Sequence, residues 1–128
     1  MTEKKLPHDH GRLAHIRPED IPDTEVFLPA SDLFKLLGDG SRMRIFWLLC
    51  HCELCVINLS ALVEMSSPAV SHHLRQLKNG GLIQSRREGK EVYYRAAGTE
   101  QVRLLHQAIE QLLGKECPEA RCLKKEEA

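Results

Sequence analysis

Two short apolar periodicities separated by a tight turn constrain this chain more than any other feature of its sequence. Leu59, Leu62 and Val63 lie at i, i+3 and i+4, a spacing that predicts a short helix. A second helix is expected close behind it, because Ser67 is a good N-cap and Pro68 suits the first helical position. Apolar residues then recur at positions 70, 74 and 77. Two short helices joined by a three- or four-residue turn form a helix-turn-helix.

A β-hairpin is expected directly after this pair of helices. Asn79-Gly80-Gly81 supplies a helix stop. Extended runs at Leu82–Arg87 and Glu91–Ala96 flank Glu88-Gly89-Lys90, and the β-branched and aromatic residues of the second run favour a strand. A helix-turn-helix followed by a hairpin predicts a winged helix.

Three further helices are expected around this motif. Ala30–Leu37 is helical in pattern, and Thr24–Leu28 extends it if Pro29 only kinks the chain. The next helix starts after Ser41 as N-cap and ends at Cys50-His51-Cys52. The last helix begins at Gly98 or Thr99 and ends at Gly114, with an apolar stripe at 102, 104, 105, 108, 109, 112 and 113. One small domain cannot cover so wide a stripe, which predicts a two-fold dimer.

The chain is expected to divide into a flexible arm at residues 1–22, a winged-helix dimer domain at 23–114 and a charged tail at 115–128. The arm has no sustained apolar period and contains three prolines. No apolar stretch reaches the ~18–20 residues of a membrane span, and the charged N-terminus is unlike a secretion signal. We therefore expect a cytoplasmic protein with no membrane partner, whose cysteines are mostly thiols.

A formal net charge of zero conceals a basic block. Ser66–Arg95 contains six Lys or Arg and two acids, a net +4, whereas Met1–Glu25 is −2. This block predicts an anion-binding face. The outward side of the 67–78 helix would read bases in the major groove, and the hairpin would contact phosphates. The predicted DNA-binding residues are Ser67, Ala69, Ser71, His72, Arg75 and Gln76 on the helix, and Arg86, Arg87 and Lys90 on the hairpin.

The stretches LFKLLGDGSRMRI, ELCVINLSALVEMSSPAVSHHLRQLK and GLIQSRREGKEVYY, in that order, resemble the ArsR/SmtB family of metal-responsive repressors. The resemblance covers about residues 31–113. It implies a mainly α (α+β) winged helix-turn-helix with the order helix, helix, helix, helix, strand, strand, helix. It also implies a homodimer formed through the first and last helices, bound to an inverted repeat in a double-stranded DNA operator and released by an inducer.

The family's zinc-type site on the last helix is not matched here. Members place Asp or His near the start of that helix and His or Glu near its end. The corresponding residues are Gly98, Glu100, Gln111 and Gly114, so this site is expected to be lost. His106 lies on the same helix, but a lone histidine is more often a packing or surface residue than a ligand.

The family's other site uses cysteine in the ELCV segment, which Cys55 matches, while Ile57 and Asn58 replace its usual neighbours. Cys50, Cys52 and Cys55 lie within six residues, so three thiolates can meet one soft ion such as As(III), Cd(II), Pb(II) or Zn(II). Cys52 and Cys55 are expected at a polar bend, whereas Cys50 also fits burial as a small apolar residue. Additional candidate ligands are His8, Asp9, His10, His15, Cys117 and Cys122.

Two other functions stay open on the sequence. One keeps the repressor but switches it by thiol oxidation or a persulfide bridge, with Cys50 and Cys117 as the pair. The other is a protein-interaction module with a structural zinc, against which the polar helix face and the basic block argue. An enzyme is not expected, because no nucleophile and base, phosphate loop or paired carboxylates appear at useful spacing.

Overall fold

The computed structural model describes residues 7–8 and 17–114 of the 128. Most of the predicted arm and all of the predicted tail lie outside these residues, so both remain predictions. The described residues fall into two units, divided between Phe34 and Lys35. In the described part of the first unit, a short 3-10 helix (η1) spans Pro18–Asp20 and precedes the start of helix α1. No helix among the described residues has both the length and the apolar character that crossing a membrane requires.

Helix α1 spans Thr24–Leu36 and runs through Pro29. Of the two starts that the sequence allowed, the longer one is therefore correct. Pro29 is the sixth residue of the helix, so its missing N–H removes a single backbone hydrogen bond within the second turn. The Ser31 hydroxyl donates to the carbonyl of Leu28, 3.2 Å away, next to this point.

Helix α2 spans Gly40–His51 and is capped by Asp39, so the predicted cap at Ser41 is wrong by two residues. The Asp39 carboxylate accepts a hydrogen bond of 2.9 Å from the backbone N–H of Arg42. This bond holds the pKa of Asp39 below its usual value. A carboxylate satisfies an unpaired first-turn N–H and also interacts favourably with the helix dipole, which explains the preference over a serine further along.

The predicted helix-turn-helix is confirmed as α3 (Val56–Val63) and α4 (Ser67–Asn79). The C-cap of α3 is Glu64, which adopts the left-handed conformation with φ 55°. The N-cap of α4 is Ser66, whose hydroxyl accepts from the backbone N–H of Ala69 at 3.3 Å. The predicted cap at Ser67 is therefore wrong by one residue, because Ser66 is the serine in the extended conformation that a cap requires.

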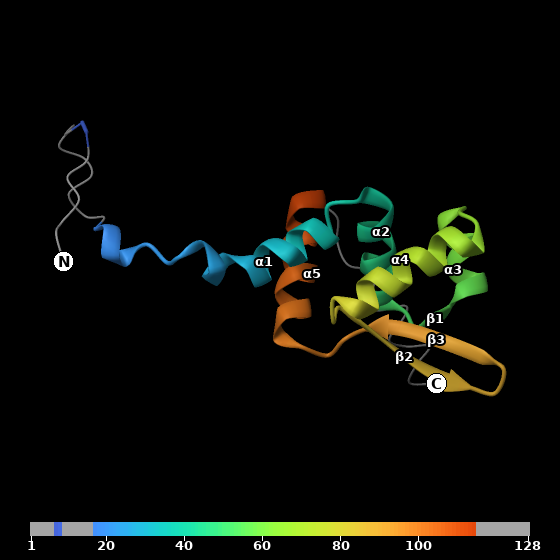
Figure 1. Cartoon of the computed structure of the whole chain (residues 1–128). Helices are drawn as coiled ribbons and strands as arrows, with labels where there is room; N and C mark the ends of the chain where they lie inside the picture. Colours follow the sequence, from blue (N-terminus) through green and yellow to red (C-terminus); the bar gives the residue numbers. More distant parts are fainter. Residues whose placement is uncertain (1–6, 9–16, 115–128) are drawn as a thin grey trace. The chain divides into compact units, whose positions relative to one another are not determined.

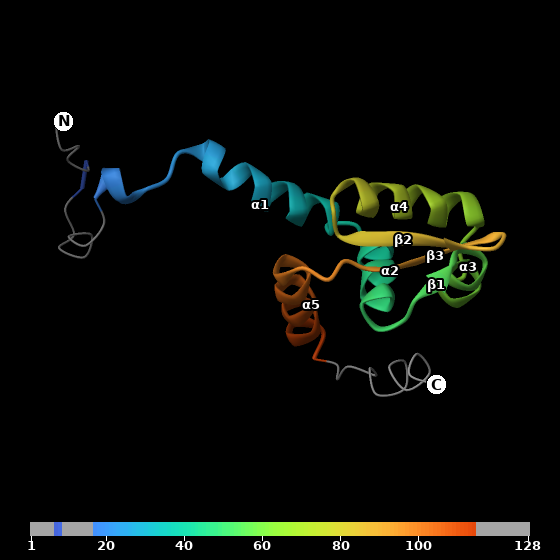
Figure 2. The same cartoon turned by 90° about the horizontal axis from the view of Figure 1, so that it is seen from below.

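The wing belongs to a three-stranded antiparallel sheet rather than to an isolated hairpin. Strands β2 (Ile83–Glu88) and β3 (Glu91–Ala96) pair around a two-residue tip, with Glu88 opposite Glu91. A short strand β1 (Leu54–Cys55) pairs with β3, giving the order β1-β3-β2. α4 runs beside β2, as Figures 1 and 2 show from two directions.

The core of the second unit is made by α2, α3, α4 and the start of β2. The stripe predicted at 70, 74 and 77 is confirmed, whereas Leu62 is 53% exposed and does not belong to the core. Helix α5 (Glu100–Leu113) is capped by Thr99 and ends before Gly114. Of its apolar residues Val102 and Ile109 are buried. The largest fully buried side chains are Phe46, Ile45, Leu59, Leu74, Leu77, Leu82 and Val70.

Candidate functional site

The outward face of α4 is accessible along its length. Ser67, His72 and Arg75 are exposed, and Ala69, Ser71 and Gln76 are half-buried. Ser67 shares a hydroxyl contact of 3.2 Å with Ser60 of α3, which ties the N-terminal end of α4 to the preceding helix. All six residues predicted to read DNA are thus exposed or half-buried, and their contact with DNA stays a prediction.

The wing carries Arg86, Arg87 and Lys90, all exposed. Arg86 is held within the protein: it pairs with Glu53 at 2.5 Å and with Glu88 at 2.7 Å, and lies 4.9 Å from the centre of the Tyr93 ring. Its hydrogen bonds lower the pKa of Glu53. By contrast, Arg87 makes a hydrogen bond of 3.4 Å to the carbonyl of Gly89 within its own turn. Two carboxylates therefore already pair with the charge of Arg86, whereas the hydrogen bond of Arg87 is to a neutral carbonyl.

A buried histidine connects α4 to α2. The Arg42 Nε–H donates to Nδ1 of His73 at 3.2 Å, and the same guanidinium donates to the carbonyl of Leu36 at 3.1 Å. His73 is 9% exposed. Burial lowers the pKa of His73, and the nearby Arg42 acts in the same direction while Asp39 opposes it. The start of α2 is thus attached to the helix that carries the predicted base-reading residues.

The cysteine segment runs from the end of α2 into β1. Cys50 and Cys52 are half-buried, and Cys55 is 8% exposed. The prediction that Cys55 lies at a polar bend is therefore wrong: Cys55 is buried in strand β1, where it pairs opposite Tyr93 of β3. Cys52 is disulfide-bonded, so its sulfur becomes a metal ligand only after reduction. Of the additional candidate ligands, His8 is exposed, whereas Asp9, His10, His15, Cys117 and Cys122 lie outside the described residues.

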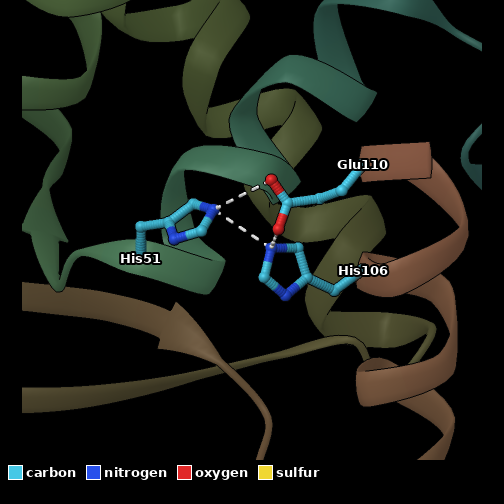
Figure 3. A group of neighbouring side chains, drawn as sticks. All are labelled: His51, His106 and Glu110. Carbon is cyan, nitrogen blue, oxygen red and sulfur yellow. Dashed lines mark hydrogen bonds and ion pairs between the residues drawn. The ribbon is translucent and has the colours of Figure 1, made fainter. Parts of the chain in front are cut away.

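One group of three potential metal ligands converges in the part of the chain that the structure describes. It contains His51, the last residue of α2, and His106 and Glu110, one turn apart on α5; their ligand atoms lie within 4.8 Å of one another. Figure 3 shows the three side chains pointing toward one another from the two helices. From its sequence, His106 was expected to be a packing or surface residue with no ligand partner. The i, i+4 spacing of His106 and Glu110 was visible, but nothing local indicated that His51 faces them.

A cavity of about 470 Å³ lies beside this group. Its lining comes from the end of α2, the end of β3 and the first turns of α5, and includes Cys50, His51, Cys52 and His106. The polar groups of α2 and α5 thus border a space large enough for water and small ligands.

Comparison with known proteins identifies the family. The family described as "Bacterial regulatory protein, arsR family" matches residues 39–85. A cadmium resistance transcriptional regulatory protein CadC homolog from Staphylococcus aureus is 38% identical over 95 residues, covering 73% of this chain and 71% of the relative. The chain belongs to the ArsR family of bacterial regulatory proteins. The arsenical resistance operon repressor of Escherichia coli is 43% identical over 70 residues, 54% of this chain and 60% of that relative. The match therefore spans less than two thirds of the second relative.

Solved structures agree with this ArsR-family assignment. The solution structure of a homodimeric winged helix-turn-helix DNA-binding domain from Mycobacterium bovis, a possible ArsR-family regulator, superposes with a TM-score of 0.63 and 32% identity. The match covers 73% of this chain and 88% of that one. The winged helix-turn-helix expected from the sequence is thereby confirmed.

Proposed function

We propose that this ArsR-family chain is a cytoplasmic, homodimeric transcriptional repressor that leaves its operator when a thiophilic metal or metalloid ion binds. The observation that carries the DNA-binding part is the accessible polar face of α4 beside the basic wing. Side chains such as Arg75 and Gln76 can hydrogen-bond base edges in the major groove. Arg87 and Lys90 are exposed on the wing, where they would contact phosphates and position the protein without reading sequence.

The dimer is supported by apolar surface that the chain does not cover itself. On α5, Leu112 is 87% exposed, and Leu104 and Leu113 are each 53% exposed. Within α1, Phe34 is 68% exposed. The relative from M. bovis is described as homodimeric. Two copies joined through such helices would place paired α4 helices about one turn of DNA apart, on an inverted repeat.

The choice of inducer rests on chemistry and on the relatives. Those relatives are named for cadmium and arsenical resistance, and thiolates prefer soft ions. We assign Cys50, Cys52 and Cys55 as the thiolates for As(III), Cd(II), Pb(II) or Zn(II), after reduction of Cys52. Because the ligands must be deprotonated, binding should release protons and weaken at low pH.

Thiol oxidation is the second candidate for the switch, because Cys52 is disulfide-bonded while Cys50, close to it in sequence, is still a thiol. In that case Cys50 and Cys117 remain the proposed responsive pair. An oxidant would then release DNA, and no ion would do so while reductant is present.

The test is DNA binding measured by fluorescence anisotropy, with a labelled duplex from upstream of the chain's own gene, under anaerobic reductant. Cd(II) or As(III) should release the wild type, and Cys52→Ser and Cys55→Ser should each stay bound. Moving a site from almost fully bound to almost fully free requires a preference of ~5.5 kcal/mol, which loss of one of three thiolates should largely abolish. Cys117→Ser is the control and should respond nearly normally. Release of the Cys52→Ser, Cys55→Ser double variant by Cd(II) would contradict the cysteine assignment.

A further inference from the structure

We propose that His51, His106 and Glu110 form a second, nitrogen- and oxygen-liganded site for a divalent cation of the zinc class, joining α2 to α5 within one chain. This site shares no ligand with Cys50, Cys52 and Cys55, although His51 lies between the first two of them in sequence. It also differs from the last-helix site of the family resemblance, whose matching positions carry Gly98, Glu100, Gln111 and Gly114. It therefore does not depend on the cysteine-mediated release proposed above.

The spacing of the three ligand atoms fits a tetrahedral ion. His106 Nε2 lies 3.0 Å from His51 Nε2 and 2.9 Å from Glu110 Oε1, and His51 Nε2 lies 4.0 Å from Glu110 Oε2. Zinc bonds of about 2.0–2.2 Å place neighbouring tetrahedral corners about 3.3–3.6 Å apart. The two imidazole nitrogens are 3.0 Å apart, close to this range, whereas the two Glu110 distances end at different carboxylate oxygens. With one ligand atom from each residue, the three atoms lie within 4.8 Å of one another, so side-chain rotations would have to bring them onto one ion.

His106 Nε2 lies within hydrogen-bond distance of both other residues, 3.0 Å from His51 Nε2 and 2.9 Å from Glu110 Oε1. An imidazole nitrogen carries either one hydrogen or one lone pair. In the tautomer with the hydrogen on the opposite ring nitrogen, each Nε2 has a lone pair, as a carboxylate oxygen does. A divalent cation would then be bound by all three groups at once.

The surroundings of Glu110 hold its carboxylate in place. Trp47 Nε1 donates to Oε2 at 3.3 Å, and the Trp47 ring packs edge-on against His51 with centroids 4.7 Å apart. Ligating carboxylates are commonly fixed by such a donor. Three protein ligands leave a fourth position for water or a small ligand. The neighbouring cavity, which His51 and His106 both line, can supply it.

The test is a Co(II) titration of the full-length chain under anaerobic reductant, with Co(II) as a spectroscopic substitute for zinc. Trp47 is the only tryptophan of the chain, so its emission reports this site. We expect saturable quenching together with visible cobalt absorption. His106→Gln and Glu110→Gln should each weaken binding by at least the ~10–100-fold that loss of an outer-shell partner costs. Glu100→Gln, on the same helix but outside the group, is the matched control and should bind like the wild type.

The two test side chains are 21% and 16% exposed, and circular dichroism on each variant checks that it is folded. Unchanged quenching in both folded variants would overturn the site. Cobalt binding that His106→Gln and Glu110→Gln retain but Cys52→Ser and Cys55→Ser abolish would also overturn it. The titration contains no DNA, so this site and the proposed cysteine-mediated release can each fail alone.

Discussion

Arg87 and Arg86 are adjacent on β2, and the structure predicts that only Arg87 contributes to the salt dependence of DNA binding. Each phosphate that a protein neutralises on B-DNA contributes about −0.9 to the slope of log K against log salt concentration. Arg87→Ala should therefore reduce the slope by about 1.8 in a dimer with one contact per subunit. Between 50 and 200 mM salt, that change alters the ratio of wild-type to variant affinity by about 12-fold.

The matched control removes the ion pair of Arg86 without changing net charge. Because Arg86 already pairs with Glu53 and Glu88, the double variant Glu53→Gln, Arg86→Gln removes one base and one acid together. Its salt slope should equal that of the wild type. Fluorescence anisotropy on one duplex at several salt concentrations measures all three proteins. An unchanged slope in Arg87→Ala, or an equal loss in the double variant, would refute the reasoning.

Three other substitutions test separate parts of the structure. Burial lowers the pKa of His73 in the folded protein, so as the pH falls the unfolded chain binds a proton at a higher pH than the folded chain does. The free energy of unfolding is therefore unaffected by His73 above about pH 6.5 and decreases as the pH falls toward the folded pKa. The urea midpoint of His73→Gln should vary less than the wild type's between about pH 7.5 and 5, and equal slopes would contradict this. Gly89→Ala should lower the free energy of unfolding by about 1 kcal/mol in denaturant titrations, because φ at this position is 62°. Crowding does not contribute, since no atom beyond the neighbouring residues lies within 4 Å of an added Cβ. An unchanged midpoint would argue against this turn conformation. Trp47→Phe keeps an aromatic ring but loses the indole N–H that bonds Glu110. Co(II) titrations followed by visible absorption should therefore show ~10–100-fold weaker binding. Wild-type affinity would exclude a positioning role for the indole N–H.

Elements with an apolar period were predictable from the sequence, whereas strand β1 and the caps of α2 and α4 were not. The stripe at 70, 74 and 77 placed α4 correctly because three buried residues at helical spacing leave one inward face. Strand β1 was missed because two residues show no alternation; it exists through pairing with β3, which is distant in sequence. The caps at Asp39 and Ser66 were missed because Ser41 and Ser67 are also plausible caps nearby. Only the backbone conformation decides between the two candidates in each case.

The His51, His106 and Glu110 group shows the same limit for sites. His106 and Glu110 share a face of α5 by their spacing, which a sequence reveals. His51 is 55 residues away from His106, and its direction depends on how α2 packs against α5. Likewise, nothing in the order of Arg86 and Arg87 shows that Glu53, 33 residues away, pairs with the first of them.

Helix α2 would be the physical connection between the proposed ion site and the proposed DNA-binding face. Its first turn holds α4 through Arg42 and His73, its last residue is His51, and it contacts both α4 and α5. Contact alone does not establish coupling, since an ion shifts DNA affinity only if it prefers one of two arrangements. Any such coupling must be reciprocal. The factor by which Zn(II) changes DNA affinity must therefore equal the factor by which DNA changes Zn(II) affinity. In the Cys52→Ser, Cys55→Ser background, both factors should differ from one and should move toward one together in Arg42→Ala. Anisotropy measures the DNA affinity, and Trp47 emission measures the Zn(II) affinity. A factor of one in the Cys52→Ser, Cys55→Ser protein that retains Arg42 would show that the ion site does not regulate DNA binding.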